Sequence, residues 1–212
     1  GLGLIGGSFE KAFRRAGHET FDLKNAPAAD IGACDFVFVC LPPLLVAPWI
    51  KEHADDFAAG AIVTDAAGVK GVVMDALRET AKSSRWTYIG GHPMAGSERF
   101  GYPNAKASLL ENAYYILTPT PETSAEKLED YRELVTQTGA IPLILDYRQH
   151  DYVTAAISHL PHVIAASLVN LVRDSDSEEG IMKMVAAGGF KDITRIASSS
   201  AQMWQQICLT NT

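Results

Sequence analysis

The chain has 212 residues, of which 47% are hydrophobic and 20% are charged. This composition excludes global disorder, and the length allows one large domain or one domain plus part of a second. The formal net charge of −7 excludes the broad basic surface that nucleic acids require. An anionic ligand must therefore be held by a few placed cations or by helix N-termini.

The cysteines Cys34, Cys40 and Cys208 show no metal-type spacing. Cys40 lies in an apolar run and is typical of a small core residue, which fits a reducing compartment. We find no apolar stretch long enough to span a bilayer and no signal peptide. The sequence therefore predicts a cytoplasmic protein with neither a nucleic-acid nor a membrane partner.

The first two thirds of the chain alternate between predicted helices and strands. A helix is expected over Ser8–Gly17, where apolar residues recur at helical spacing and a glycine ends the run. Such alternation predicts an α/β fold with a parallel sheet. The expected strands are His18–Asp22, Asp35–Leu41, Ala61–Thr64, Trp86–Ile89, Tyr114–Leu117 and Ile141–Leu145, and the further helices are Pro48–Phe57, Val69–Lys82 and Ser124–Thr138.

Only helical periodicity follows Asp151, over Tyr152–Val172, Ile181–Ala187 and Thr194–Leu209. Pro161 removes a backbone N–H inside the first of these helices and should bend it. We therefore predict an α/β domain over residues 1–147 and a helical domain over residues 148–212.

Gly1-x-Gly3-x-x-Gly6 has the spacing of the dinucleotide fingerprint and opens directly into a helix. Asp22 follows about 20 positions later at a predicted strand end, where its carboxylate can bind the adenosine ribose. This favours NAD, although NADP stays open because Lys24 could meet a phosphate. The fold class is thus a Rossmann-type doubly wound sheet, with Gly1, Gly3, Leu4, Ile5, Gly6, Asp22, Leu41 and Pro42 as the expected cofactor-binding residues.

The sequence begins at this glycine turn, without the central strand that normally precedes it. We therefore expect the polypeptide to extend upstream of Gly1. About a dozen residues separate Asp22 from Asp35, which is short for a parallel crossover. Either a helix and an edge strand are reduced here, or residues are absent.

Three further segments carry chemistry. His92, in Gly90–Glu98, follows an apolar strand and could accept a proton from an alcohol; the alternative is a histidine that caps a turn. Asp151 is placed as an N-cap, and Ser158, His159 and His162 follow it at helical spacing. Arg195 offers a planar fork suited to a carboxylate, with a surface salt bridge as the alternative.

A metal site formed by Asp151, His159 and His162 is the competing interpretation of the segment that holds these residues. No Cys or Glu joins these residues at metal-site spacing, so we expect no metal. A purely structural role for one of the two histidines also stays open.

The segments GLGLIGGS, GGHPMAGSE, HD…SHLPH and GGFKDITRIA…MW together resemble the prephenate/arogenate dehydrogenase family. The resemblance implies a helical dimerisation domain after the Rossmann domain, a homodimer, and NAD-dependent oxidative decarboxylation of prephenate or arogenate in tyrosine biosynthesis. By motif, it makes His92 catalytic, Arg195 the anchor of a substrate carboxylate and His162 a neighbour of the pyruvyl side chain. Ser158, His159, Ser97, Glu98 and Trp204 match residues that line or gate the pocket.

One position departs from that family pattern. The family commonly has D-x-x-S-x-K after the middle strand, whereas this chain has Gly68 in place of the serine. Loss of one hydroxyl should weaken substrate orientation by about 1–3 kcal/mol if its partner is left unpaired. Gly68 and the short crossover leave open a catalytically impaired nicotinamide-binding regulatory homologue. The other alternative is a reductase of the 3-hydroxyacid or imine type, which shares the plan of a Rossmann domain followed by helices.

Overall fold

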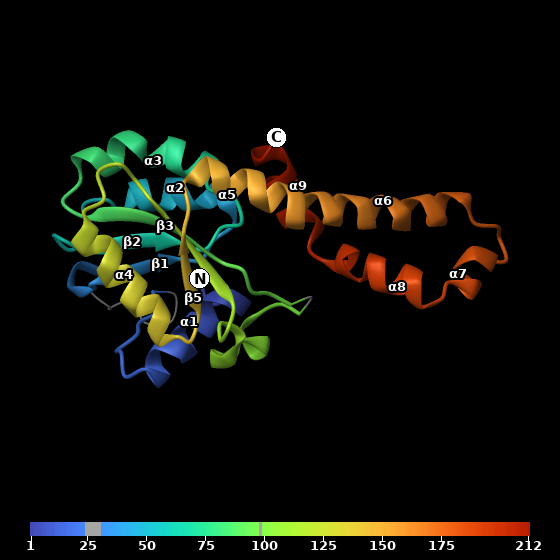
Figure 1. The fold of residues 1–212 in the computed structure, drawn as a ribbon, viewed down its shortest axis with the longest axis horizontal. Helices are drawn as coiled ribbons and strands as arrows, with labels where there is room; N and C mark the ends of the chain where they lie inside the picture. The colour runs from blue at the N-terminus through green and yellow to red at the C-terminus, as the bar shows by residue number, and fades with distance from the viewer. Residues whose placement is uncertain (24–30, 98) are drawn as a thin grey trace.

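A five-stranded sheet forms the centre of the first part of the chain (Figure 1). The computed structural model describes residues 1–23, 31–97 and 99–212. The strands lie in the order in which they occur in the sequence. They are β1 (Phe36–Val39), β2 (Ile62–Asp65), β3 (Thr87–Pro93), β4 (Tyr114–Pro119) and β5 (Ile141–Ile144).

The strand pairs β1–β2, β2–β3 and β4–β5 are parallel, whereas β3 and β4 are antiparallel. The expectation of a parallel sheet therefore holds for three pairs and is wrong for β3–β4. The segment between β3 and β4 contains only short 3-10 turns, Tyr102–Asn104 and Ala107–Leu109, and no full crossover helix is described there. Without such a helix, the chain returns beside β3 in the opposite direction.

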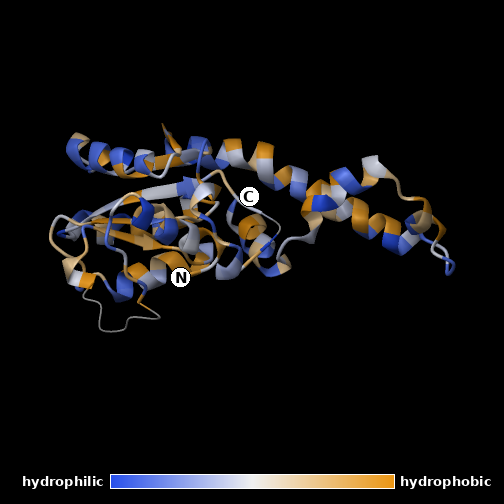
Figure 2. Ribbon diagram, turned by 90° about the horizontal axis from the view of Figure 1, so that it is seen from below, coloured by the Kyte–Doolittle hydropathy of each residue, from blue (hydrophilic) through white to orange (hydrophobic). Residues whose placement is uncertain are grey.

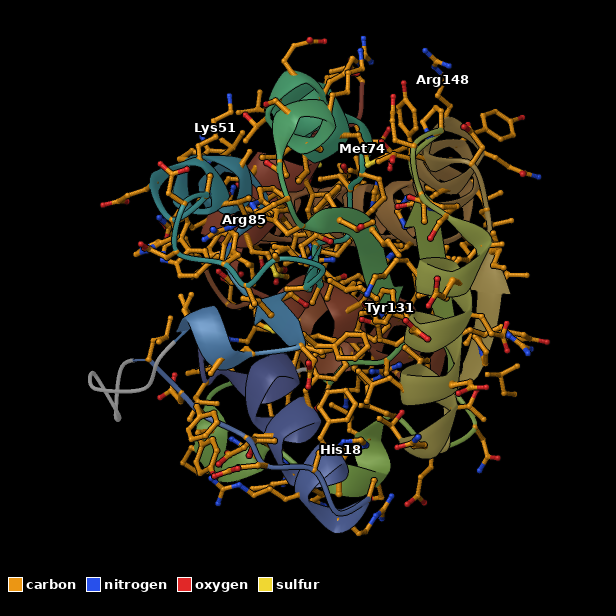
Figure 3. All side chains as sticks on the ribbon, turned by 90° about the vertical axis from the view of Figure 1, so that its left-hand side faces the viewer. His18, Lys51, Met74, Arg85, Tyr131 and Arg148 are labelled. Atoms are coloured by element: carbon orange, nitrogen blue, oxygen red, sulfur yellow. The ribbon has the colours of Figure 1, made fainter. Side chains whose placement is uncertain are left out.

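Helices cover both faces of the sheet, as the end-on view in Figure 3 shows. A core on one face contains Ile50 and Leu77, from α2 and α3. The core on the other face contains Phe9 and Tyr131, from α1 and α4. The doubly wound, Rossmann-type fold is thus confirmed. The helices are α1 (Leu4–Arg15), α2 (Pro43–Glu52), α3 (Gly71–Ser83) and α4 (Ala125–Gln137), and a 3-10 turn, Ile31–Ala33, precedes β1.

The second part of the chain is helical, as predicted, and extends away from the sheet as an arm (Figure 1). A π-helical turn, Ala155–His159, comes directly before α6, whose second residue is Pro161. Proline cannot donate to the carbonyl four residues earlier, and a widened turn relieves the resulting clash. The helices are α5 (Tyr147–Thr154), α6 (Leu160–Ser175), α7 (Ile181–Val185), α8 (Gly188–Thr194) and α9 (Ala201–Thr210), with a 3-10 turn at Arg195–Ser198.

Several predicted elements differ from the structure. The helix expected at Pro48–Phe57 begins earlier, as α2 (Pro43–Glu52), with Pro48 in its interior. The predicted strand His18–Asp22 is irregular in the structure, because its polar groups bond to helices: Arg14 donates to Thr20 and His18 bonds Gln137. The predicted helix Thr194–Leu209 is interrupted after the 3-10 turn at Arg195–Ser198. The Ser200 hydroxyl accepts from the Met203 amide and starts α9 as a separate helix.

The expectation about apolar stretches is also wrong. Residues Tyr147–Ser175 form a continuous helical run of 29 residues that, by length and composition alone, could cross a membrane. In the sequence, histidine and serine residues interrupt the apolar residues of this stretch, so it was not recognised as one long apolar helix. Only 17% of the most apolar 18-residue stretch of this run is buried. Figure 2 shows apolar segments along the arm.

Candidate active site

The glycine turn lies at the start of α1, beside the chain that leaves β1. A Cβ on Gly6 would clash with the Gly1 carbonyl oxygen, and one on Gly1 would lie 3.4 Å from the Cys40 carbonyl oxygen. Gly3 is the N-cap of α1, and among the described residues beyond its chain neighbours and the helix backbone nothing lies within 4 Å of its Cβ position. The turn is therefore closed on the sheet side and open in front of the helix N-terminus. Leu4, Ile5, Leu41 and Pro42 flank this turn and the neighbouring strand end.

The other expected cofactor contact is less well placed. Asp22 is half-buried and follows the irregular segment after α1, so it does not stand at a strand end as expected. Its contact with a ribose stays a prediction. Lys24 and Glu98, two further candidates from the sequence, lie outside the described residues.

His92 is the penultimate residue of β3, near its carboxyl end. Its Nδ1 lies 2.8 Å from His150 Nε2. A Cβ on Gly68 would lie 3.7 Å from His92 Nε2. One ring nitrogen of His92 is therefore bound by α5, while the other faces the loop after β2.

The hydrogen-bonded chain continues beyond His92. His150 is fully buried, and its Nδ1 lies 2.7 Å from Asp151 Oδ1. The Asp151 carboxylate also accepts from the amides of Lys70 and Gly71, both at 2.7 Å. We expected Asp151 to be the N-cap of its own helix, and this is wrong. Asp146 caps α5, whereas Asp151 binds the backbone at the start of α3.

A buried ion pair holds the backbone next to His92. Lys70 and Asp65 are both fully buried and bond each other. Lys70 Nζ also donates to the Gly91 carbonyl at 2.6 Å, and Asp65 accepts from the Gly91 amide at 3.2 Å. Tyr88 donates to the second Asp65 oxygen at 3.1 Å. Both polar backbone groups of the residue before His92 are therefore fixed.

The electrostatic environment keeps His92 neutral. Burial lowers the pKa of His92 well below its usual value, and the nearby positive charge of Lys70 lowers it further. Burial likewise lowers the pKa of His150, although Asp151 acts in the opposite direction. A neutral imidazole can accept a proton, so the site provides a base.

A second group of rings lies beside this chain. His159 Nδ1 lies 3.0 Å from the Asn211 amide nitrogen, and the same nitrogen donates to the Asp151 carbonyl at 2.9 Å. His162 stacks on Trp204 with ring centres 3.5 Å apart. Within the described part of the chain, His162 Nδ1 and Trp204 Nε1 are buried without hydrogen-bond partners. Ser158 is half-buried in the adjoining π-helical turn.

The remaining candidates lie on exposed segments. Arg195 is exposed at the start of its 3-10 turn, which packs against α6. Ser97 is exposed, and its hydroxyl accepts from the Arg99 amide. Within residues 1–23, 31–97 and 99–212, no group of three or more His, Cys, Asp or Glu side chains has a metal-binding arrangement.

Sequence reasoning missed several members of the site. Asp65, Lys70 and His150 were not among the expected functional residues, and Asp151 received the wrong role. The adjacent His150-Asp151 pair and the lysine five residues after Asp65 were the available signals. Neither reveals a partner that is distant in the sequence.

The comparisons with known proteins follow the same two-part division. The family model described as "Prephenate dehydrogenase, nucleotide-binding domain" matches residues 6–143, and "Prephenate dehydrogenase, dimerization domain" matches residues 146–212. The chain belongs to the prephenate dehydrogenase family. It is 36% identical to the prephenate dehydrogenase of Bacillus subtilis over 233 aligned residues, which cover all of this chain and 62% of that protein.

Solved structures of family members agree with the fold. The prephenate dehydrogenase of A. aeolicus, in complex with hydroxyphenyl propionate and NAD+, superposes with a TM-score of 0.87 and 31% identity, covering 100% of this chain and 80% of that one. The Synechocystis arogenate dehydrogenase superposes with a TM-score of 0.81 and 27% identity, covering 100% and 82%. Family members thus include enzymes named for either substrate.

Proposed function

We propose that this protein is a cytoplasmic, NAD-dependent prephenate dehydrogenase of tyrosine biosynthesis. The observation that carries the proposal is His92. Its Nδ1 is held by His150, the ring is kept neutral by its surroundings, and its Nε2 faces the space beside Gly68. This is the arrangement that a base for an alcohol oxidation requires.

The glycine turn fits a dinucleotide. The side chain missing at Gly6 lets α1 pack on the turn, and the open space at Gly3 lets a pyrophosphate approach the first amides of the helix. A nicotinamide dinucleotide bound there would supply the hydride acceptor. NADP stays the alternative, since the ribose contact of Asp22 is a prediction.

The reaction balances with His92 as the sole proton acceptor. His92 Nε2 takes the proton of the ring hydroxyl as the carbinol carbon gives up its hydride. The C–C bond to the ring carboxylate then breaks, CO₂ leaves, and its electron pair aromatises the ring. The new phenolate oxygen takes the proton back from His92, so the base is restored.

The substrate side chain would lie toward the helical arm. Arg195 would bind a carboxylate as a planar fork, and the buried, unpartnered nitrogens of His162 and Trp204 would meet the polar pyruvyl group. Ser97, Ser158 and His159 complete the proposed pocket. We also propose that the arm packs on a second copy of the chain, which would cover the apolar surface of the 147–175 run.

Activity assays test this proposal directly. Prephenate and arogenate are each mixed with NAD+ and with NADP+, and reduced nicotinamide is followed by absorbance. His92→Asn should lower kcat by about 10²–10⁴-fold with unchanged NAD+ affinity, whereas Arg195→Gln should mainly raise the substrate KM. NAD+ binding without turnover of either substrate would contradict the proposal and indicate a regulatory homologue.

A further inference from the structure

We infer that Asp151 and His150 act as positioning residues through His92: they hold the His92 ring as its Nδ1–H tautomer and leave the Nε2 lone pair facing the substrate. The inference rests on the proposed function of His92 as the base. It assigns a role to a His–His–Asp chain that crosses from the helical arm into the sheet.

The proton positions follow from the donors around Asp151. The Lys70 and Gly71 amides can only donate, and they occupy one oxygen each at 2.7 Å. Asp151 is therefore an ionised acceptor, and the pKa agrees: burial acts to raise it, but the hydrogen bonds from His150 and the two amides hold it below its usual value. His150 Nδ1, at 2.7 Å from Oδ1, must then carry the proton.

The proton position on His150 determines the proton position on His92. A neutral imidazole has one N–H, so a His150 protonated at Nδ1 has a lone pair at Nε2. This lone pair lies 2.8 Å from His92 Nδ1, which must therefore donate. Since His92 is neutral, its Nε2 is left as an acceptor.

The hydrogen-bonded side chains of His92, His150 and Asp151 also affect the positive charge that forms during catalysis. When His92 takes a proton, the imidazolium forms close to the buried ammonium of Lys70, which opposes it. Asp65 pairs with Lys70, and Asp151 places a second negative charge behind His150. The arm also holds the backbone of Asp151, because the Asn211 amide donates to the Asp151 backbone carbonyl and contacts His159 Nδ1.

Histidine NMR tests the tautomer independently of any activity. Long-range ¹H–¹⁵N correlation spectra of the ¹⁵N-histidine-labelled, full-length protein distinguish protonated from unprotonated ring nitrogens. We expect His92 and His150 to be protonated at Nδ1 and unprotonated at Nε2 at neutral pH. A His92 protonated at Nε2 would overturn the inference even if the wild-type enzyme is active.

Two variants of His150 separate positioning from simple packing. His150→Gln retains an oxygen that can accept from His92 Nδ1, whereas His150→Leu removes every acceptor. We expect kcat/KM to fall at least about 100-fold in His150→Leu and by no more than about 10-fold in His150→Gln, with unchanged NAD+ affinity. Equal losses in both variants, or no loss in His150→Leu, would overturn the inference.

The pH profile supplies a further readout. His92 is faced by His150 from α5, by His159 from the π-helical turn and by Lys70 from the loop after β2, with Asp65 and Asp151 behind them. A neutral His150 accepts from His92 Nδ1 with the Asp151 carboxylate behind it, so it favours the protonated form of His92. In His150→Leu the pKa of His92 should therefore fall and the acidic limb of kcat/KM should move to lower pH, and an unmoved limb would count against the inference.

The chain offers a matched control in His53. Its Nδ1 lies 2.9 Å from Asp56 Oδ2, a similar His–Asp pair at the end of α2. His53→Leu should leave kcat/KM, the pH profile and the His92 tautomer unchanged. If the wild type turns over neither substrate, the proposed function fails, while the spectra still decide the tautomer.

Discussion

Position 68 is occupied by glycine, and its surroundings leave space for a larger residue. A Cβ there would make only an ordinary contact of 3.7 Å with His92 Nε2. A serine hydroxyl at this position could reach the hydroxyl of a bound substrate, as the family resemblance implies. We predict that Gly68→Ser raises kcat/KM by up to about 10-fold, which corresponds to about 1.4 kcal/mol, in steady-state assays with prephenate.

The Gly68→Ala variant is the control for this prediction. Alanine fills the same space and restricts the unfolded chain in a similar way, but it lacks the hydroxyl. It should therefore keep the kcat/KM of the wild type. A serine variant no faster than the alanine variant would show that the missing hydroxyl has no cost here.

Single residues were predictable where a short motif carries them. His92 was found because it comes after the apolar run Trp86–Ile89, in GGHPMAGSE, and the glycine turn was found because of its spacing. His150 was missed because its meaning depends on His92, 58 positions earlier in the chain. Hydrogen bonds of this kind become visible only once the sheet edge and α5 are placed together.

At the level of elements, the Asp65–Lys70 pair joins the end of β2 to β3 and to the start of α3. Both side chains are fully buried, so removing one partner leaves a buried charge without compensation. We predict that Lys70→Met lowers the free energy of unfolding by about 3–5 kcal/mol, as measured by urea denaturation. Asp65→Asn combined with Lys70→Met should recover part of this loss.

The exposed pair Lys82–Glu79 on α3 provides the comparison. Its atoms are 3.2 Å apart, yet solvent screens them. Lys82→Met should change the free energy of unfolding by less than about 1 kcal/mol. Similar effects of the two lysine substitutions would contradict the role given to the buried pair.

The helices and strands were predictable where burial imposes a recognisable spacing of apolar residues on the sequence. The unbroken apolar runs predicted β1 and β2, and apolar residues at helical spacing predicted α3 and α4. The segment 18–22 has strand-like residues, but it bonds to α1 and α4 instead of joining the sheet. The antiparallel return of β4 could not be predicted, since the local pattern of a buried strand is the same in either direction.

At the scale of the whole molecule, the helical arm exposes apolar residues that a single copy of the chain does not cover. Figure 2 shows apolar segments along the arm. Leu171 and Val185, in α6 and α7, are 61% and 70% exposed. Exposed apolar surface of this extent marks an interaction site. The match of residues 146–212 to a dimerization domain supports a second copy of this chain as the occupant.

We predict that Leu171→Glu and Val185→Glu each convert the homodimer to a monomer, because a carboxylate buried between two copies must lose its hydration. Size-exclusion chromatography with light scattering over a range of concentrations measures the mass. Ile141→Glu places the same charge on an exposed apolar residue of β5 and should leave the dimer intact. A wild type that stays monomeric at high concentration would contradict the proposed dimer, and dimeric arm variants would place the contact on another surface.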